Sequence, residues 1–383
     1  MIPVSNPYID IKDLRYFKRL FKSKILTDGF FQKKCEEIIK KKISSKFVAL
    51  THSCTGALEI SALLINLKKG DEVIMPSYGF VSIANAIVMR GAKPIFAEID
   101  PQTLNISHDD IIKKINKKTK AVYVIHYAGN ACEIYKIKKY LKKKNIYLIE
   151  DAAHSFLSQS KNKYLGTIGD IGVFSFHETK NLVSGQGGCI SINNPNLKKR
   201  ANFILDKGTD RYNFIRNYKK KLISSKIKKY YSWVDYGSEY RASELTSALL
   251  YSQLLKVNKI QKKREQIWKR FKSCILNIEN RDFYIIEPLA NTKSSYHLFV
   301  IIFKDQKKSQ KFIDFMQKNL IAATFHYVPL HKSKMAKKIS KQKLSVTERI
   351  FRRVVRLPLY PDMKLKDQRK IMNKIKEFCH EQY

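Results

Sequence analysis

The stretch Gly172-Val-Phe-Ser-Phe-His-Glu-Thr-Lys-Asn181 indicates how this chain folds. Its apolar first half is typical of a buried strand, and polar residues follow where that strand is predicted to end. Similar short apolar runs precede it and alternate with longer amphipathic segments. Buried strands that alternate with helices predict βαβ units, so we expect an α/β fold with a mostly parallel central sheet. The predicted strands are residues 47–50, 73–75, 94–99, 122–126, 146–149, 172–176 and 188–192, and the predicted helices are 55–67, 82–90, 109–114 and 134–144.

The pattern changes in the last third of the chain. A long helical pattern covers residues 245–276, and shorter segments follow it. These segments predict strands at 283–286, 296–303 and 322–327 and a helix at 310–318. We therefore expect two domains, a large one over residues 1–254 and a smaller α+β domain over residues 255–383.

The composition is that of a globular protein with a strongly basic surface. The chain has 383 residues, of which 44% are hydrophobic, and 74 Lys and Arg against 33 Asp and Glu give a net charge of +41. A basic protein attracts polyanions, so a non-enzymatic nucleic-acid-associated protein is one alternative. The lysines are spread along the whole chain, however, and no nucleic-acid recognition motif accompanies them. We expect a solvated lysine-rich surface and no nucleic-acid partner.

The sequence shows no pattern typical of a membrane span, a signal peptide, a zinc site or a disulfide framework. No apolar run approaches the roughly 20 residues that span a bilayer, and the first residues lack a signal-peptide pattern. The six cysteines are far apart, without the spacing of a zinc site or a disulfide framework. We expect a cytoplasmic protein with reduced thiols, no membrane partner and no metal site.

Two polar segments follow predicted strands of the first domain, where α/β proteins place ligand sites. Thr51-His-Ser-Cys-Thr-Gly-Ala-Leu58 links a strand to a helix, and its backbone amides could hold a phosphate. Taken alone it fits an ordinary N-cap by Ser53 or Thr55 better. Ile149-Glu-Asp-Ala-Ala-His-Ser155 ends a strand with a carboxylate that could bind a charged heterocycle or cap the next helix.

Two further segments carry a lysine and two histidines. Lys180 follows the 172–176 strand and lies beside the glycine-rich run Ser184-Gly-Gln-Gly-Gly-Cys189. A lysine desolvated there would have a lowered pKa and could attack a carbonyl carbon, although most lysines are solvated surface groups. A predicted strand runs into the segment Phe325-His-Tyr-Val-Pro-Leu-His331, which contains two histidines. Single histidines of this kind are commonly structural.

In combination, the four segments occur in the order found in fold-type I pyridoxal-phosphate enzymes. The chain resembles the DegT/DnrJ-type sugar-nucleotide aminotransferases over nearly its whole length. The resemblance implies the aminotransferase fold type I, with a large domain around a mostly parallel sheet and a smaller C-terminal α+β domain. The motifs that carry it are Gly70-Asp-Glu-Val-Ile-Met-Pro-Ser-Tyr78, His126-Tyr-Ala-Gly129, Glu150-Asp-Ala-Ala153, Ser175-Phe-His-Glu-Thr-Lys-Asn181, Phe325–His331 and Arg356-Leu-Pro-Leu359.

The resemblance also implies roles for individual residues toward pyridoxal 5'-phosphate (PLP). Lys180 would bind the cofactor covalently and move the proton at the reacting carbon. Asp151 would keep the pyridine nitrogen protonated, so that the ring acts as an electron sink. The remaining cofactor-binding matches are Thr55, Gly56, Ala57 and Ser175 at the phosphate, Phe80 stacked on the ring and His154 at the ring hydroxyl.

Substrate and partner are implied by the same resemblance. The runs 128–133, 177–181 and 206–211 are most similar to the branch of dTDP-4-amino-4,6-dideoxygalactose transaminases. We therefore expect amino transfer from L-glutamate to dTDP-4-keto-6-deoxyglucose, with Arg211, His326 and Tyr327 contacting the sugar nucleotide. The alternatives are an aminotransferase that acts on a 3-keto-6-deoxy sugar nucleotide and a sugar dehydratase that depends on pyridoxal or pyridoxamine phosphate.

The segment Tyr236-Gly-Ser-Glu-Tyr-Arg241 resembles one that reaches the cofactor phosphate of a neighbouring subunit, so we expect a homodimer with shared active sites. Glu239 departs from the family pattern and would repel a phosphate unless Arg241 or another base neutralises it. The lysine-rich segment 211–231 is longer and more basic than expected, and its lysines at 219–221, 226, 228 and 229 are candidate diphosphate contacts.

Overall fold

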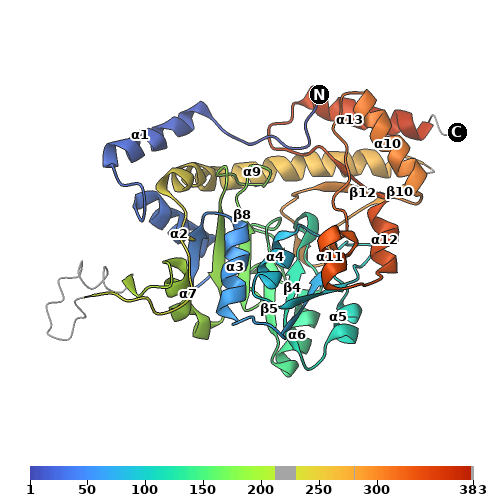
Figure 1. Ribbon diagram of the computed structural model, residues 1–383. Helices are drawn as coiled ribbons and strands as arrows, with labels where there is room; N and C mark the ends of the chain where they lie inside the picture. Colours follow the sequence, from blue (N-terminus) through green and yellow to red (C-terminus); the bar gives the residue numbers. More distant parts are fainter. Residues whose placement is uncertain (212–229, 280, 381–383) are drawn as a thin grey trace.

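The computed structural model describes residues 1–211, 230–279 and 281–380 (Figure 1). The basic segment 211–231 singled out above therefore lies outside the described residues, except for Arg211, Tyr230 and Tyr231. The lysines predicted to contact a diphosphate all fall in that undescribed part.

A seven-stranded sheet forms the centre of the molecule, in the order β1-β9-β8-β5-β4-β2-β3. Neighbouring strands from β8 to β3 are parallel, and β9 runs antiparallel to β8 and β1. This confirms the expected mostly parallel sheet. The strands are β1 (Val48–Thr51), β2 (Glu72–Pro76), β3 (Lys93–Ala97), β4 (Thr119–Ile125), β5 (Tyr147–Asp151), β8 (Ile171–Ser175) and β9 (Gly188–Ile192).

Helices cover both faces of this sheet. Its strands are therefore continuous apolar runs in the sequence, because side chains on both faces are buried. In β4, Ala121 and Tyr123 pack in one cluster with α3, while Val122 and Val124 pack in another with α6. Successive residues of a strand point to opposite faces, so one strand supplies both cores. The covering helices are α3 (Cys54–Leu64), α4 (Ser82–Val88), α5 (His108–Lys114), α6 (Ile134–Lys144) and α7 (Lys198–Leu205).

A three-stranded antiparallel sheet in the order β10-β12-β13 centres the C-terminal part. Its apolar side chains form a separate cluster with the second half of α9 and with two further helices. The elements are α9 (Glu244–Leu276), β10 (Phe283–Ile285), β12 (Phe299–Phe303), α10 (Gln306–Lys318), α11 (Lys334–Ile339), α12 (Ser345–Phe351), β13 (Val354–Leu357) and α13 (Leu365–His380).

The long helix α9 joins the two parts of the molecule. Leu250 and Leu254 pack with the first part, whereas Trp268 and Phe271 pack with the C-terminal sheet. The helix therefore runs through the position 254/255 at which we placed the domain boundary. A division there remains a proposal, because one continuous helix contributes to both cores.

Two predicted strands differ from the structure. Residues 322–327 do not form a strand, since only Thr324 makes an isolated bridge, to Arg356. The place beside β12 is taken instead by β13, which pairs Val300 with Arg356. The strand expected at 296–303 begins only at Phe299, because Tyr296 has a left-handed φ of 49°.

The segment before residue 47 also differs from expectation, because no helix or strand was predicted there. The structure forms α1 (Leu14–Ser23) and α2 (Phe30–Lys42) there, and both pack on α9. The buried Glu244 carboxylate accepts hydrogen bonds from the amides of Phe31 (2.9 Å) and Gln32 (2.7 Å), which fixes the beginning of α2. The short strands β6 (Gln159–Ser160), β7 (Lys163–Tyr164) and β11 (Thr292–Lys293) form a third small sheet.

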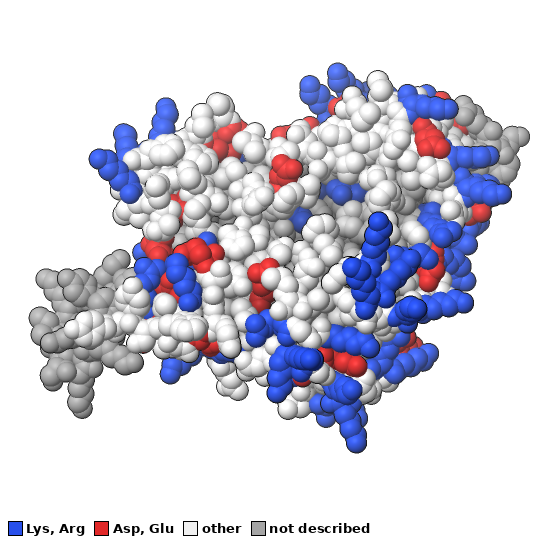
Figure 2. Space-filling model, in the orientation of Figure 1, with Lys and Arg blue, Asp and Glu red and all other residues white. Residues whose placement is uncertain are grey.

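The surface charge is distributed broadly rather than along a single groove. In Figure 2, Lys and Arg side chains gather over α5, α6, α11 and α12, with only a few acidic residues between them. Across the described ranges, none of the helices is both long and apolar enough to cross a membrane.

Candidate active site

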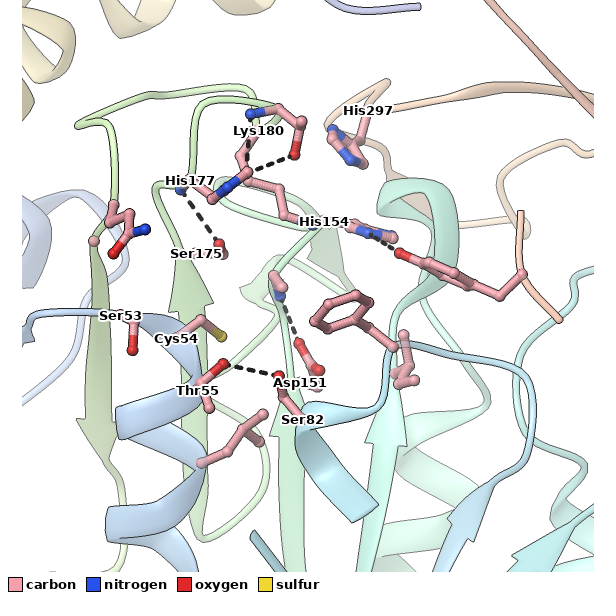
Figure 3. A pocket seen from close by; sticks show the side chains of 18 of the residues that line it. Ser53, Cys54, Thr55, Ser82, Asp151, His154, Ser175, His177, Lys180 and His297 are labelled. Carbon is pink, nitrogen blue, oxygen red and sulfur yellow. Dashed lines mark hydrogen bonds between the residues drawn. The ribbon is translucent and has the colours of Figure 1, made fainter. Parts of the chain in front are cut away.

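A cavity of about 590 Å³ lies at the carboxyl ends of β1, β5 and β8 (Figure 3). Polar residues follow each of these strands, and parallel strands end at the same edge of the sheet. Residues of the C-terminal part close the cavity from the other side. It is lined by Ser53, Cys54, Thr55, Leu58, Phe80, Ser82, Ile125, Asp151, Ala153, His154, Ser175, His177, Thr179, Lys180, Gln186, Gly187, His297, His326, Tyr327 and Arg356.

The beginning of α3 supplies hydroxyl groups to this cavity. Ser53 is the N-cap, and its Oγ accepts the amide hydrogen of Gly56 at 3.0 Å. Thr55 Oγ1 lies 2.8 Å from Ser82 Oγ, so two hydroxyls from α3 and α4 meet at the cavity wall (Figure 3). The positive end of the helix dipole and these hydroxyls suit a phosphate.

The glycine-rich run beside Lys180 allows the chain to approach α3 closely. A Cβ atom at Gly188 would lie 2.5 Å from the amide nitrogen of Cys54, a backbone atom that cannot yield. Any larger residue at 188 would therefore push β9 away from the beginning of α3. This packing explains why the sequence needs glycine there.

Asp151 is the last residue of β5 and is 8% exposed. Its Oδ1 accepts the amide hydrogen of Ala153 at 2.9 Å. Burial raises the pKa of the carboxyl group, while the Ala153 amide and the positive charge of Lys180 act in the opposite direction. A cation bound in the cavity would restore the ionised form.

The neighbouring residue Glu150 holds β5 in place from the other face of the sheet. Its carboxylate is fully buried and accepts the amide hydrogens of Gly166 (2.8 Å) and Ile168 (2.7 Å). His126 Nε2 lies 2.9 Å from the same carboxylate. This network orients the strand end from which Asp151 enters the cavity.

Lys180 lies five residues beyond the end of β8, in a turn closed by its own amide, which donates to the carbonyl of His177 at 2.9 Å. Desolvation in the cavity lowers the pKa of the Lys180 amine to about 8, and the charge of Asp151 opposes part of this effect. An amine with this pKa is available as a nucleophile near neutral pH.

Three buried histidines, His154, His297 and His326, line the cavity together with Lys180, and Figure 3 labels the first two. The ring of His154 lies 4.4 Å from that of His297 and 5.8 Å from that of His326, measured between centroids. Burial lowers the pKa of all three, to about 2 for His326, so the imidazoles are neutral. Asn181 Oδ1 lies 2.8 Å from His297 Nδ1 and thereby links the Lys180 turn to the C-terminal part.

Most of the predicted site residues meet in the cavity, and three do not. The eight that line it are Thr55, Phe80, Asp151, His154, Ser175, Lys180, His326 and Tyr327. Gly56 and Ala57 are buried in the first turn of α3 outside the lining, and their amides donate to Ser53. The hydroxyls of Ser53, Thr55 and Ser82, rather than these two amides, therefore face the cavity.

Arg211 is the third predicted residue outside the lining. Its guanidinium pairs with Asp206, with Nη2–Oδ1 at 3.0 Å and Nε–Oδ2 at 3.2 Å. Glu239 pairs with Lys207, and Arg241 lies instead near Asp28 and Glu36. Lys207 therefore supplies a base that neutralises Glu239.

Several lining residues were missed by the sequence analysis. Ser82, His297 and Arg356 come from separate elements, and nothing in their local sequence indicated a shared cavity. Arg356 stands in a motif that supported the family resemblance, and that motif was the one available signal. Its role could not be assigned before the strand pairing of β13 was known.

The cavity fits PLP. Its volume lies in the range of cofactor sites, and hydroxyls at a helix start, a buried carboxylate and an amine of lowered pKa stand around it. His154 Nδ1 is buried without a hydrogen-bond partner among the described residues, as expected for a group that binds a ligand. Phe80, which is 61% exposed, also lines the cavity. No cluster of metal-ligating residues occurs in residues 1–211, 230–279 and 281–380.

The fold and this site define a PLP-dependent aminotransferase. The sequence profile of the DegT/DnrJ/EryC1/StrS aminotransferase family matches residues 7–376, and the chain belongs to that family. It is therefore an enzyme of sugar-nucleotide transamination.

Individual relatives cover essentially the whole chain. An uncharacterized protein of Methanocaldococcus jannaschii is 32% identical over 388 residues, with 99% of this chain and 98% of that protein covered. A GDP-perosamine synthase of Vibrio cholerae is 28% identical over 382 residues, covering 99% of each chain. The crystal structure of the aminotransferase TlmJ from Streptoalloteichus hindustanus superposes with a TM-score of 0.90, at 26% identity and full coverage of both chains.

Proposed function

We propose that this enzyme transfers the amino group of L-glutamate to a 4-keto-6-deoxy sugar attached to a nucleoside diphosphate, for the synthesis of an amino-sugar polysaccharide. The observation that carries the proposal is the combination of Lys180, Asp151 and the hydroxyl-rich beginning of α3 around one cavity. The regiochemistry at C4 rests on the resemblance of the runs 126–133 and 177–181 to 4-keto transaminases.

The cofactor, when bound, supplies an electron sink that allows nitrogen to move between donor and acceptor. Thr55, Ser82 and Ser175 would bind its phosphate, with the dipole of α3 adding to the attraction. Asp151 would keep its ring nitrogen protonated through a charge-assisted hydrogen bond. Phe80 would pack against its ring.

Lys180 has two tasks in this proposal. Its amine would hold the cofactor covalently in the resting enzyme, and it would accept and return the proton at the reacting carbon. The lowered pKa suits both tasks, because the amine is easily deprotonated. The neutral His326 and the Tyr327 hydroxyl, which line the same cavity, would bind the sugar by hydrogen bonds.

Two nucleosides are candidates for the acceptor. The similarity of residues 206–211 favours a dTDP-linked sugar, namely dTDP-4-keto-6-deoxyglucose, giving dTDP-4-amino-4,6-dideoxygalactose. The name of the Vibrio cholerae relative, GDP-perosamine synthase, specifies a GDP-linked sugar and favours a GDP-linked acceptor. Both candidates require the same chemistry in the cavity.

A small substrate panel tests the proposal. The purified holoenzyme is incubated with L-glutamate and, separately, dTDP- and GDP-linked 4-keto-6-deoxyhexoses and a dTDP-linked 3-keto-6-deoxyhexose. Mass spectrometry and NMR then identify the products. We expect an amine at C4 of one 4-keto sugar. Amination only of the 3-keto sugar would overturn the C4 assignment, and loss of water without amination would identify a dehydratase.

A further inference from the structure

A chain of three polar side chains links the central sheet to the C-terminal part of the molecule. Ser77 Oγ lies 2.6 Å from His331 Nδ1, and His331 Nε2 lies 3.1 Å from Glu348 Oε1. Ser77 directly follows β2, His331 lies in the short helical turn Leu330–Lys332, and Glu348 belongs to α12. Because Ser77 and His331 are buried, the hydrogen bond between them is shielded from water.

The direction of these hydrogen bonds follows from the carboxylate. Hydrogen bonds from Lys332 and His331 lower the pKa of the Glu348 carboxyl to about 2, so the ionised group accepts the hydrogen of His331 Nε2. In the neutral imidazole, Nδ1 then accepts the hydroxyl hydrogen of Ser77. The Ser77 hydroxyl oxygen also accepts the amide hydrogen of His331 at 3.1 Å, and the Ser77 carbonyl accepts that of Leu330 at 2.8 Å. Three hydrogen bonds therefore join Ser77 to this turn.

The arrangement differs from the triad of a serine hydrolase. In such a triad the serine contacts Nε2 of the histidine and the acid contacts Nδ1, whereas here the two partners are exchanged. Ser77 is 0% exposed, and its hydroxyl is already used both as donor and as acceptor. The serine is thus closed to a substrate, and its hydrogen bonds hold two segments of the chain together.

Only one of these two segments is fixed by secondary structure. Ser77 continues β2 of the central sheet, and its amide donates to the carbonyl of Ala97 at 3.3 Å. Residues 325–329, in contrast, form neither helix nor strand. This irregular segment carries His326 and Tyr327, which line the cavity. The hydrogen bonds of Ser77 therefore attach the end of a cavity-lining segment to the sheet.

The beginning of the same segment is held by two tyrosines. The hydroxyls of Tyr78 and Tyr127 both donate to the carbonyl of His326, the second at 2.7 Å. The ring of Tyr327 lies 6.2 Å from that of Tyr78 and 6.4 Å from that of Phe80, measured between centroids. Tyr327 therefore lies between the tyrosine hydrogen bonds on one side and the serine–histidine hydrogen bond on the other.

We propose that His331 is a positioning residue for the sugar substrate, an inference that rests on the proposed function, in which His326 and Tyr327 bind the sugar. Its hydrogen bond to Ser77 keeps the segment 326–331 in the conformation that binds the sugar before the sugar arrives. Without this bond, that conformation is only part of the population, and the apparent affinity falls in proportion. The reaction with the amino donor does not use these contacts and should be spared.

Single-turnover kinetics of the two half-reactions test the proposal. The aldehyde form of the enzyme is mixed with L-glutamate. The amine form is mixed with the dTDP- or GDP-linked 4-keto-6-deoxyhexose, whichever the wild-type protein aminates. The absorbance of the cofactor gives a maximal rate and an apparent Kd for each substrate. Rates are expressed per bound cofactor, so that unfolded protein does not contribute.

The variants separate the two hydrogen bonds of the imidazole. His331→Leu has a side chain of similar size without a hydrogen-bonding group. In His331→Asn, the amide oxygen can still accept the hydroxyl hydrogen of Ser77, while the contact with Glu348 is lost. Lys332→Gln is the matched control, because it removes only the exposed ion pair that the neighbouring residue forms with Glu348.

We expect His331→Leu to raise the apparent Kd for the sugar nucleotide by about 5- to 150-fold, as for the loss of one buried hydrogen-bond partner. The apparent Kd and maximal rate with L-glutamate should change less than about threefold. His331→Asn should recover most of the affinity for the sugar nucleotide. Lys332→Gln should behave like the wild type, because an exposed ion pair contributes little.

A crystal structure of the His331→Leu variant gives a readout that does not depend on activity. Residues 326–331 should be displaced, while residues 75–80 should stay in place. Equal weakening with both substrates, an unmoved segment, or a His331→Asn variant no better than His331→Leu would overturn the inference. If the wild-type protein aminates no sugar nucleotide, the proposed function itself fails.

Discussion

The pKa of Lys180 leads to a quantitative prediction about how the cofactor-free enzyme captures PLP. In the cavity, desolvation lowers this pKa to about 8 from an ordinary value of 10.5. At pH 7 the reactive neutral amine is then about 9% of the total, against about 0.03% for an ordinary lysine. Capture should therefore be about 300-fold faster than with an unperturbed lysine amine, if the intrinsic reactivities are alike.

Stopped-flow absorbance gives the assay. Cofactor-free protein is mixed with PLP between pH 6 and 10, and the appearance of the visible band is recorded. The rate should rise about tenfold per pH unit below the pKa and level off above pH 8, because the protonated amine is not nucleophilic. Lys180→Arg should give no visible band at any pH.

The Asp151→Asn substitution tests the electrostatic argument further, because it should speed the capture of PLP but slow turnover. The Asp151 charge raises the pKa of Lys180, so its removal should shift the capture profile to lower pH and speed capture at pH 7. Glu178→Gln, which removes an exposed acid from the same turn, is the control and should leave the profile in place. A wild-type midpoint near 10.5, or an upward shift in Asp151→Asn, would refute the electrostatic argument.

Three further predictions concern turnover, assembly and substrate binding. Asp151→Asn should reduce turnover by about 30- to 900-fold, the equivalent of roughly 2–4 kcal/mol, and a near-normal steady-state rate would contradict its role. Light scattering should find a homodimer, since the 236–241 segment resembles one that crosses to a partner's site, and a fully active monomer would exclude shared sites. Arg211→Ala should raise the KM for the sugar nucleotide and leave the glutamate half-reaction intact. Equal impairment of both would show that the ion pair of Arg211 with Asp206 is purely structural.

The parallel part of the fold could be predicted because its signals are local. Each buried strand is a short apolar run, and the polar residue that follows it marks the edge of the sheet. Asp151 at the end of β5 and Lys180 beyond β8 were placed correctly for this reason. Ser53 was one of two candidate N-caps, and the structure selects it through its bond to Gly56.

The remaining features depend on contacts between distant parts of the chain. Residues 322–327 have strand composition, but β13 occupies the place beside β12. Gly56 has the small size of a phosphate-binding residue, yet its amide is used by the helix cap. Arg356 enters the cavity only because β13 pairs with Val300 and bridges Thr324, pairings that local patterns do not reveal.

The most direct test of the account is the site of covalent cofactor attachment. The purified holoenzyme is reduced with borohydride, digested and analysed by mass spectrometry. We expect one pyridoxyl-modified peptide, containing Lys180, and no modified peptide from the Lys180→Ala variant. A modification at any other lysine in the wild-type protein, or a Lys180→Ala variant that still transaminates, would contradict it.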